Sequence, residues 1–240
     1  MHVKKPYEIL LNILSLKKHA RIKLLGDSIT HGVGGTGFKQ NGAPIVRDFA
    51  RNPDGYCWAN KFKNYIEQKF GASVVNNACS GTNIEFIINN FETLVDEEDD
   101  IVICTIGTNN RHIYFKAGSK PTREELGTQF YNNIAKLYDM FVQIGKDVIF
   151  VANIPASAAN EKDGETFWRI LHMDDINAIY KHAARKLDFP FISLYDLFTE
   201  YCESNSITVN SLLRDGLHPN DQGYDVMYDL ICKELRLFDI

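Results

Sequence analysis

Short apolar runs that alternate with helix-like stretches most constrain what this chain can fold into. The runs are rich in valine and isoleucine and occupy residues 22–25, 73–76, 101–106, 148–152 and 189–194. Such runs are typical of parallel strands that are buried on both faces. The stretches between and after them have a helical period and occupy residues 57–70, 84–95, 122–144, 173–187 and 221–237. Alternation of this kind implies right-handed crossovers. We therefore predict an α/β fold, a three-layer α/β/α sandwich with about five parallel strands.

The composition narrows the classes of protein that need considering. The chain has 240 residues and a net charge of −5, with no internal repeat or linker-like tract, so we predict one domain over residues 1–240. The negative charge argues against nucleic acid or an anionic membrane surface as the main partner. Five cysteines form no C-x-x-C pair. We therefore expect reduced thiols, a cytoplasmic protein, and neither a disulfide framework nor a zinc site.

The first 20 residues resemble a signal peptide only superficially. A basic start precedes an apolar run at residues 9–16, but Glu8 and Asn12 interrupt the pattern and no A-x-A cleavage site follows. The run is also too short to span a bilayer. We predict an N-terminal amphipathic extension over residues 1–20 that packs on the domain.

The fold class predicts where a functional site should lie. In open parallel sheets, sites gather beyond the carboxyl ends of the strands. Polar or glycine-rich segments follow three of the predicted strands directly, so they should converge on that edge: residues 26–37, 77–83 and 107–111. The acidic run at residues 96–100 precedes a strand instead. We expect it to be a solvated loop at the opposite edge.

Ser28 is the candidate nucleophile, because it ends a Gly-Asp-Ser turn directly after the first strand. A serine needs a base to take its proton. Asp215 and His218, three residues apart in a turn before the last helix, could supply a base that the carboxylate orients. Each element alone also fits an ordinary turn or helix cap. A dinucleotide site at residues 32–37 is disfavoured, because the spacing G-x-G-x-x-G opening onto a helix is absent.

Two further residues could stabilise negative charge on a substrate oxygen. Gly81 follows the second strand, where its backbone N–H could approach a ligand, and Asn109 follows the third strand with a side-chain amide. Such donors stabilise the oxyanion of acyl transfer. Either residue alone fits an ordinary turn position.

Taken in order, these four segments resemble the sequence blocks of the SGNH hydrolase superfamily, also called GDSL esterases. The resemblance spans residues 22–220 and implies a flavodoxin-like fold and ester hydrolysis without a metal or other cofactor. It implies a triad of Ser28, Asp215 and His218, and an oxyanion hole formed by Ser28, Gly81 and Asn109.

The sequence departs from the family pattern at two positions. Ile29 replaces the leucine of the GDSL name, and Asn110 stands where the family often has aspartate. The first change is conservative, and the second position usually acts in local structure. Neither departure changes the predicted catalytic set.

The substrate prediction depends on aromatic and arginine side chains in three insertions. Arg47 lies in residues 31–55, Trp168 and Arg169 lie in residues 155–172, and a third insertion at residues 111–121 adds two more aromatics. Aromatic rings beside arginine suit stacking and hydrogen bonding to a sugar. We expect these three residues, together with Asp27, to bind the substrate.

Within the family, this favours removal of a small acyl group, such as acetyl, from a carbohydrate or related polar ester. A lipid-type esterase, lysophospholipase or thioesterase, acyl transfer between hydroxyls, and a non-catalytic glycan-binding module on the same fold remain as alternatives. The sequence gives no oligomeric state.

Overall fold

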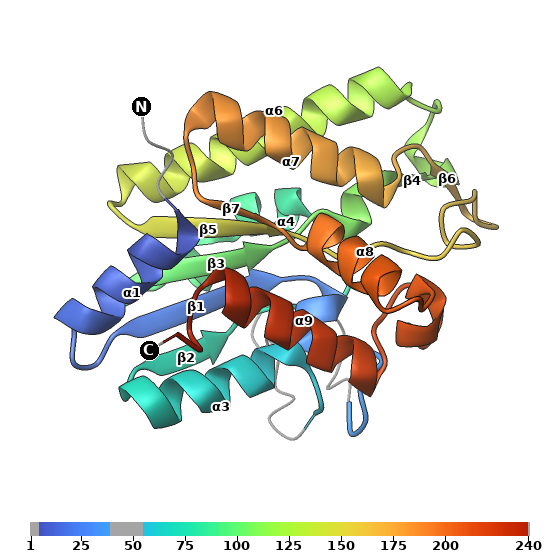
Figure 1. Ribbon diagram of the computed structural model, residues 1–240. Coiled ribbons are helices and arrows are strands. Elements are labelled where there is room, and N and C mark those ends of the chain that lie inside the picture. The colour runs from blue at the N-terminus through green and yellow to red at the C-terminus, as the bar shows by residue number, and fades with distance from the viewer. Residues whose placement is uncertain (1–4, 39–54, 240) are drawn as a thin grey trace.

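The computed structural model describes residues 5–38 and 55–239. Its centre is a parallel sheet of five strands in the order β2-β1-β3-β5-β7 (Figure 1). The strands are β1 Arg21–Gly26, β2 Ser73–Asn76, β3 Ile101–Thr105, β5 Asp147–Ala152 and β7 Phe191–Ser193. This sheet confirms the predicted α/β fold class. The strand order is that of flavodoxin-like folds.

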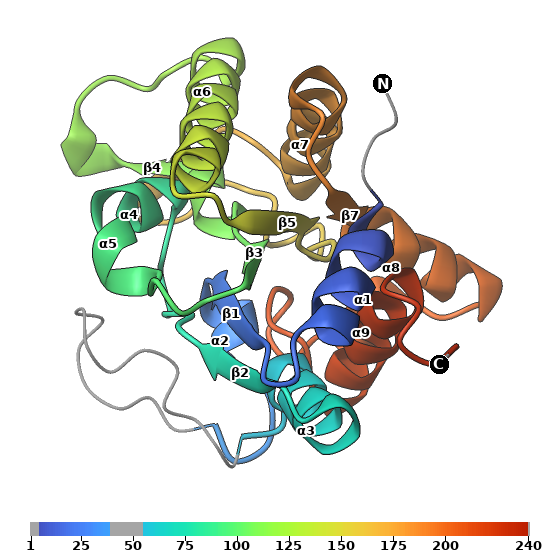
Figure 2. The same cartoon turned by 90° about the vertical axis from the view of Figure 1, so that its left-hand side faces the viewer.

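Helices cover both faces of the sheet and make the outer two layers (Figures 1 and 2). One face carries α1 Pro6–Leu16, α3 Trp58–Phe70, α8 Leu194–Ser204 and α9 Asp221–Glu234. The other carries α4 Ile84–Asn89, α5 Phe91–Leu94, α6 Arg123–Gln143 and α7 Met173–Leu187. The remaining short elements are α2 Ser28–His31, η1 Thr108–Arg111, β4 His112–Tyr114, η2 Phe115–Ala117, β6 Phe167–Arg169 and η3 Val209–Leu212.

The α1 helix packs on the sheet through one apolar face. Ile9, Leu10 and Ile13 are buried in the same core cluster as β1 and α9. Within the described residues, no helix has both the length and the apolar character needed to cross a membrane.

The structure departs from the predicted elements in three places. The stretch predicted as a helix at residues 84–95 is broken at Asn90, whose N–H bonds back to the carbonyls of Phe86 and Ile87. The α8 helix was not predicted. Nor was the two-stranded antiparallel ribbon in which β4 pairs with β6.

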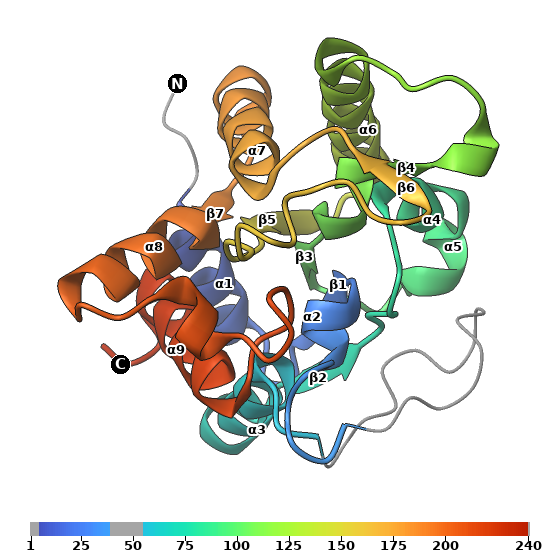
Figure 3. The ribbon, with the colours of Figure 1, turned by 90° about the vertical axis from the view of Figure 1, so that its right-hand side faces the viewer.

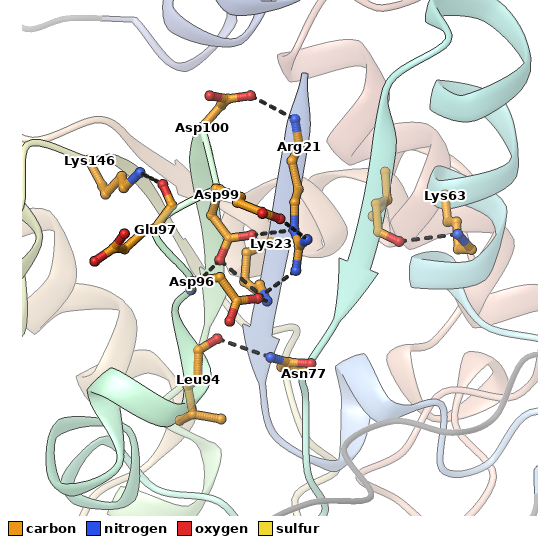
Figure 4. A network of polar contacts seen from close by, with 12 residues as sticks. Arg21, Lys23, Lys63, Asn77, Leu94, Asp96, Glu97, Asp99, Asp100 and Lys146 are labelled. Carbon is orange, nitrogen blue, oxygen red and sulfur yellow. Dashed lines mark hydrogen bonds and ion pairs between the residues drawn. The ribbon is translucent and has the colours of Figure 1, made fainter. Parts of the chain in front are cut away.

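The acidic run at residues 96–100 is a loop at the opposite edge, as expected, but it is solvated only in part (Figure 4): residues 96–98 are exposed, whereas Asp99 is buried and Asp100 is half-buried. Lys23 is fully buried within β1, with its Nζ 2.8 Å from an Asp96 oxygen and 3.3 Å from an oxygen of Asp99, which is also buried. The Arg21 guanidinium donates to Asp96 and Asp99 at 2.5 and 2.9 Å. A charge that leaves water needs a charged or hydrogen-bonding partner. The acidic run therefore supplies the partners of two cations from β1.

Candidate active site

The Gly-Asp-Ser turn lies at the carboxyl edge of the sheet, where β1 runs into α2 (Figure 3). Gly26 has no room for a side chain, because a Cβ there would lie 2.5 Å from Thr105 Oγ1 and 2.7 Å from Thr30 Oγ1. Asp27 caps α2 by accepting a hydrogen bond from the N–H of Ile29. These constraints fix Ser28 as the first residue of α2, where it is 8% exposed.

Ser28, His218 and Asp215 form a continuous chain of hydrogen bonds. Ser28 Oγ lies 2.8 Å from His218 Nε2, and His218 Nδ1 lies 2.7 Å from Asp215 Oδ2. The other carboxylate oxygen, Oδ1, accepts the backbone N–H groups of Leu217 and His218 at 3.0 and 2.8 Å. The carboxylate is thus fixed before it meets the ring. A proton on Nδ1 leaves Nε2 free to accept the serine proton.

The same contacts keep Asp215 ionised. Burial would raise the pKa of this carboxyl, but the hydrogen bonds from the backbone and ring of His218 hold the pKa below its ordinary value. The aspartate is therefore an acceptor at neutral pH, which is what an imidazole N–H requires.

Two glycines allow neighbouring loops to approach the Asp–His turn closely. Gly216 has a φ of +84°, and its carbonyl accepts the N–H of Ser157 at 2.8 Å. Gly34 has a φ of +100°, and a Cβ there would lie 2.4 Å from the Pro219 oxygen and 3.0 Å from His218 Cβ. The glycine-rich segment after α2 thus packs against the Asp–His turn.

The two predicted oxyanion donors lie in turns after β2 and β3. Gly81 has a φ of +80°, a Cβ there would meet nothing within 4 Å, and its N–H donates to no acceptor among the described residues. Asn109 lies in η1, and its Nδ2 donates one hydrogen to the Thr82 carbonyl at 2.8 Å. The second hydrogen of this amide can then be donated to a ligand. Thr82 directly follows Gly81, so this bond ties the two turns together.

Asn110, which replaces a frequent family aspartate, has a local structural role. Its Oδ1 accepts the N–H of Ile84 at 3.0 Å, and its Nδ2 donates to Glu85 at 2.8 Å. Asn110 therefore attaches η1 to the start of α4.

Asp27 does not have the substrate-binding position expected for it. Its side chain is completely buried, and Asn153 Nδ2 donates to its second oxygen at 2.9 Å. Burial raises the pKa of this carboxyl, while hydrogen bonds from Thr108 and Ile29 oppose the shift. Asp27 thus supports the turn that carries Ser28.

Asn153, at the start of the loop after β5 (residues 153–166), was missed as part of the site, because only substrate contacts were expected from the insertion at residues 155–172. Asn153 is buried and also donates to Thr108 Oγ1 at 2.7 Å, so it joins the first and third sequence blocks. A signal was present in the sequence. Asn153 directly follows a buried strand, as the other polar segments at this edge do.

Arg111 is a second buried residue that the sequence did not single out. Its guanidinium donates to the Thr108 carbonyl at 2.9 Å, to Glu161 at 2.6 Å and to Asn160 Oδ1 at 3.0 Å. Burial lowers the pKa of Arg111 to about 10, which leaves it charged at neutral pH.

Two of the predicted substrate-binding residues, Trp168 and Arg169, are neighbours on β6. Trp168 lies on β6, half-buried, with its ring 4.8 Å from that of Phe115. Arg169 stacks over Phe167, with the guanidinium carbon 4.9 Å from the ring centre. Arg47 lies outside the described residues. These residues stay predictions.

His31 is a further polar group at this edge. It is buried, its Nδ1 lies 2.9 Å from Ser80 Oγ, and burial lowers its pKa. Among the described residues, no group of three or more histidine, cysteine or acidic side chains is arranged to hold a metal ion.

A parallel sheet with a hydrogen-bonded Ser–His–Asp chain at its carboxyl edge defines the class of serine hydrolases. The model of the GDSL-like lipase/acylhydrolase family matches residues 24–226, so the chain belongs to this family. It is a serine esterase, and its reaction is the hydrolysis of acyl esters.

Solved structures share the fold at low sequence identity. An acetylxylan esterase from Geobacillus stearothermophilus is 18% identical with a TM-score of 0.65, covering 90% of this chain and 94% of that chain. An α/β hydrolase from the metagenome of Lake Arreo has the same identity and TM-score, covering 90% and 95%. A protein of Parabacteroides merdae described as a GDSL-like lipase is 16% identical with a TM-score of 0.66, covering 92% and 98%. No curated protein matches the sequence significantly.

Proposed function

We propose that this esterase removes a small acyl group, acetyl, from a carbohydrate or related polar substrate through an acyl-enzyme on Ser28. The observation that carries the catalytic assignment is the chain of contacts from Ser28 Oγ through the His218 ring to Asp215, with both distances below 3 Å. This chain supports a nucleophile, a general base and an orienting carboxylate in the roles that acyl transfer needs.

The reaction then proceeds in two halves. His218 Nε2 takes the proton of Ser28 as the serine oxygen attacks the ester carbonyl, and Asp215 stabilises the imidazolium that forms. The imidazolium protonates the leaving alcohol, which leaves the acyl group on Ser28. Water then gives its proton to the same nitrogen and attacks the acyl-enzyme, releasing the acid and restoring the serine.

The oxyanion of each tetrahedral intermediate needs donors that are already in place. The backbone N–H groups of Ser28 and Gly81 and the second amide hydrogen of Asn109 fill this role in our proposal. Two observations support it: the open space at Gly81 and the bond that fixes the Asn109 amide to Thr82.

Three observations favour a small acyl group and a polar substrate. Ser28 is only 8% exposed, which favours an acyl group that fits a confined space. The half-buried Trp168 and Arg169 could stack with and donate to a sugar.

The third observation is that a structural neighbour is an acetylxylan esterase. The catalytic residues of that enzyme bear on the proposed triad and not on the substrate. The enzyme has alanine variants of a serine, an aspartate and a histidine, each described as catalytic, and that aspartate precedes that histidine by three residues. Asp215 precedes His218 by the same spacing.

A fluorophosphonate probe and a panel of esters test the proposal. The wild type should be labelled at Ser28 and should hydrolyse acetylated sugars and p-nitrophenyl acetate faster than long-chain p-nitrophenyl esters. Ser28→Ala should lose labelling and more than about 10⁴ of kcat while its melting temperature stays unchanged. Ser211→Ala, which alters an exposed serine on η3, is the matched control.

Each other outcome points to a different function. A preference for long chains would favour a lipid-type esterase, and efficient transfer to added alcohols or sugars would favour an acyltransferase. Absence of labelling and turnover would favour a non-catalytic glycan-binding module.

A further inference from the structure

The loop after β5, residues 153–166, contacts three parts of the candidate site that are far apart in the sequence. Asn153 donates to Asp27 beside the nucleophile and to Thr108 beside Asn109. Ser157 donates its backbone N–H to Gly216, inside the Asp–His turn. One loop therefore touches the nucleophile turn, the η1 turn and the acid–base turn.

The η1 turn is held on both sides of Asn109. On one side, the Thr108 hydroxyl accepts from Asn153 at 2.7 Å. On the other, the Arg111 guanidinium reaches Glu161 at 2.6 Å and Asn160 at 3.0 Å. Asn109 is thus centred between two attachments to the same loop.

The two residues that Arg111 reaches, Asn160 and Glu161, are themselves held by hydrogen bonds. The second carboxylate oxygen of Glu161 accepts the backbone N–H of Met173, the first residue of α7, at 3.0 Å. The N–H of Asn160 donates to the Ser157 carbonyl at 2.9 Å. The connection therefore continues from Arg111 through Asn160 and Ser157 to the carbonyl of Gly216.

We propose that Arg111 is a positioning residue, which sets the Asn109 amide relative to the Asp215–His218 turn by clamping η1 to the Asn160–Glu161 segment. This inference rests on the proposed function, because it matters only if Asn109 stabilises an oxyanion. Arg111 is 1% exposed, and Thr108, Asn160 and Glu161 accept from its three guanidinium nitrogens. It therefore acts on the reaction through Asn109 and not by touching substrate.

The role predicts a particular kinetic signature. A donor that moves by a fraction of an ångström loses more of its interaction with the transition state than with the ground-state carbonyl. Loss of Arg111 should therefore lower kcat and leave KM and the pH dependence of kcat/KM nearly unchanged, because backbone N–H groups of its own turn hold the Asp215 carboxylate against His218.

The test is a double-mutant cycle between Arg111→Met and Asn109→Ala, measured with p-nitrophenyl acetate. Asn109→Ala should lower kcat by about 10²–10³, the range found when one oxyanion donor is removed. Arg111→Met alone should lower kcat by up to about 100-fold, the cost of misplacing a catalytic group by about 1 Å. When Asn109 is already alanine, adding Arg111→Met should lower kcat by less than about threefold, because the amide that Arg111 positions is absent.

Two further variants separate positioning from folding. Arg111→Lys keeps the charge facing Glu161 but cannot reach all three acceptors, so it should restore part of the lost kcat. Arg21→Met removes a comparably bonded arginine at the opposite edge of the sheet. It should lower the melting temperature without changing kcat of the folded protein. If Arg111→Met does not fold, Glu161→Gln takes its place in the cycle, because it weakens the same clamp with little change of shape.

The outcomes are distinct. Equal fold-losses from Arg111→Met with and without Asn109 would overturn the positioning role while leaving the esterase proposal intact. A raised KM with unchanged kcat would overturn it too. Absence of ester hydrolysis and of fluorophosphonate labelling in the wild type would refute the proposed function, and the positioning role with it.

Discussion

Replacing Asp215 by asparagine should disable the site by imposing the wrong tautomer on His218. The Asp215 Oδ1 atom accepts two backbone N–H groups, at 3.0 and 2.8 Å, so the oxygen of an asparagine amide must occupy that position. Its NH₂ group then lies where Oδ2 was, 2.7 Å from His218 Nδ1. A donor at this place forces the ring proton onto Nε2, which faces Ser28 and can no longer accept its proton.

The size of the effect follows from the loss of the general base. A wrong tautomer in a triad costs about 10⁴ in kcat, which corresponds to about 5 kcal/mol of activation free energy. Both backbone hydrogen bonds survive in Asp215→Asn, so its free energy of unfolding should change by less than about 0.5 kcal/mol. Its melting temperature should therefore move by less than about 2 °C.

The assay combines initial rates on p-nitrophenyl acetate with thermal unfolding followed by circular dichroism. Asp215→Ala is the control, because it removes the orienting acceptor and both backbone bonds. It should lose a comparable factor in kcat and also about 1 kcal/mol of stability. Retention of more than a tenth of wild-type kcat by Asp215→Asn would refute the tautomer argument.

Three other perturbations test the packing around the site and the sheet. Lys23→Met leaves the buried Asp99 short of a cation and should lower the free energy of unfolding by about 3 kcal/mol, measured by urea titration; a loss below about 1 kcal/mol would contradict the role given to this pair. The Lys23 hydrogen bond lowers the pKa of Asp96, and the contact with Lys17 lowers that of Asp100 despite its partial burial. The free energy of unfolding that these carboxylates contribute is therefore fully present above the unfolded pKa of 3.8. This contribution is lost as the pH falls through their lower folded pKa values. A urea midpoint that does not change down to about pH 2 would contradict this contribution. Gly34→Ala places a methyl group 2.4 Å from a backbone oxygen of the Asp–His turn at a positive φ, so kcat should fall at least about tenfold as that turn shifts; unchanged kinetics would show that the turn does not need this close approach.

The sheet could be predicted from the sequence because burial on both faces leaves a plain local signal. Residues 73–76 and 148–152 lie within one residue of the observed strands, and the stretch 173–187 coincides with α7. The site edge followed from the same reasoning, since parallel strands present their carboxyl ends together. That rule is why Ser28 and Asn109 could be expected at one edge.

The features that the sequence did not reveal depend on contacts between residues that lie far apart in the chain. The β4 and β6 strands have three residues each and pair across more than fifty residues of chain, for example Tyr114 with Phe167, so neither has a period to detect. The partial burial of the acidic run was missed because its partner Lys23 stands inside an apolar strand, where a lysine is not expected to be buried. Asn153 and Arg111 were overlooked for the same reason: their importance lies in their partners.

The contact between Ser28 and His218 joins residues 190 positions apart, whereas His218 and Asp215 meet within a single turn. During synthesis the serine therefore stays inert after it is made, because its base is added 190 residues later. The Tyr224 hydroxyl of α9 donates to the carbonyls of Ile29 and Val33, so docking of this late helix brings the base to the serine. Ester cleavage thus reports completion of the fold, and a chain divided in the loop before η3 would regain turnover only when its two fragments reassociate.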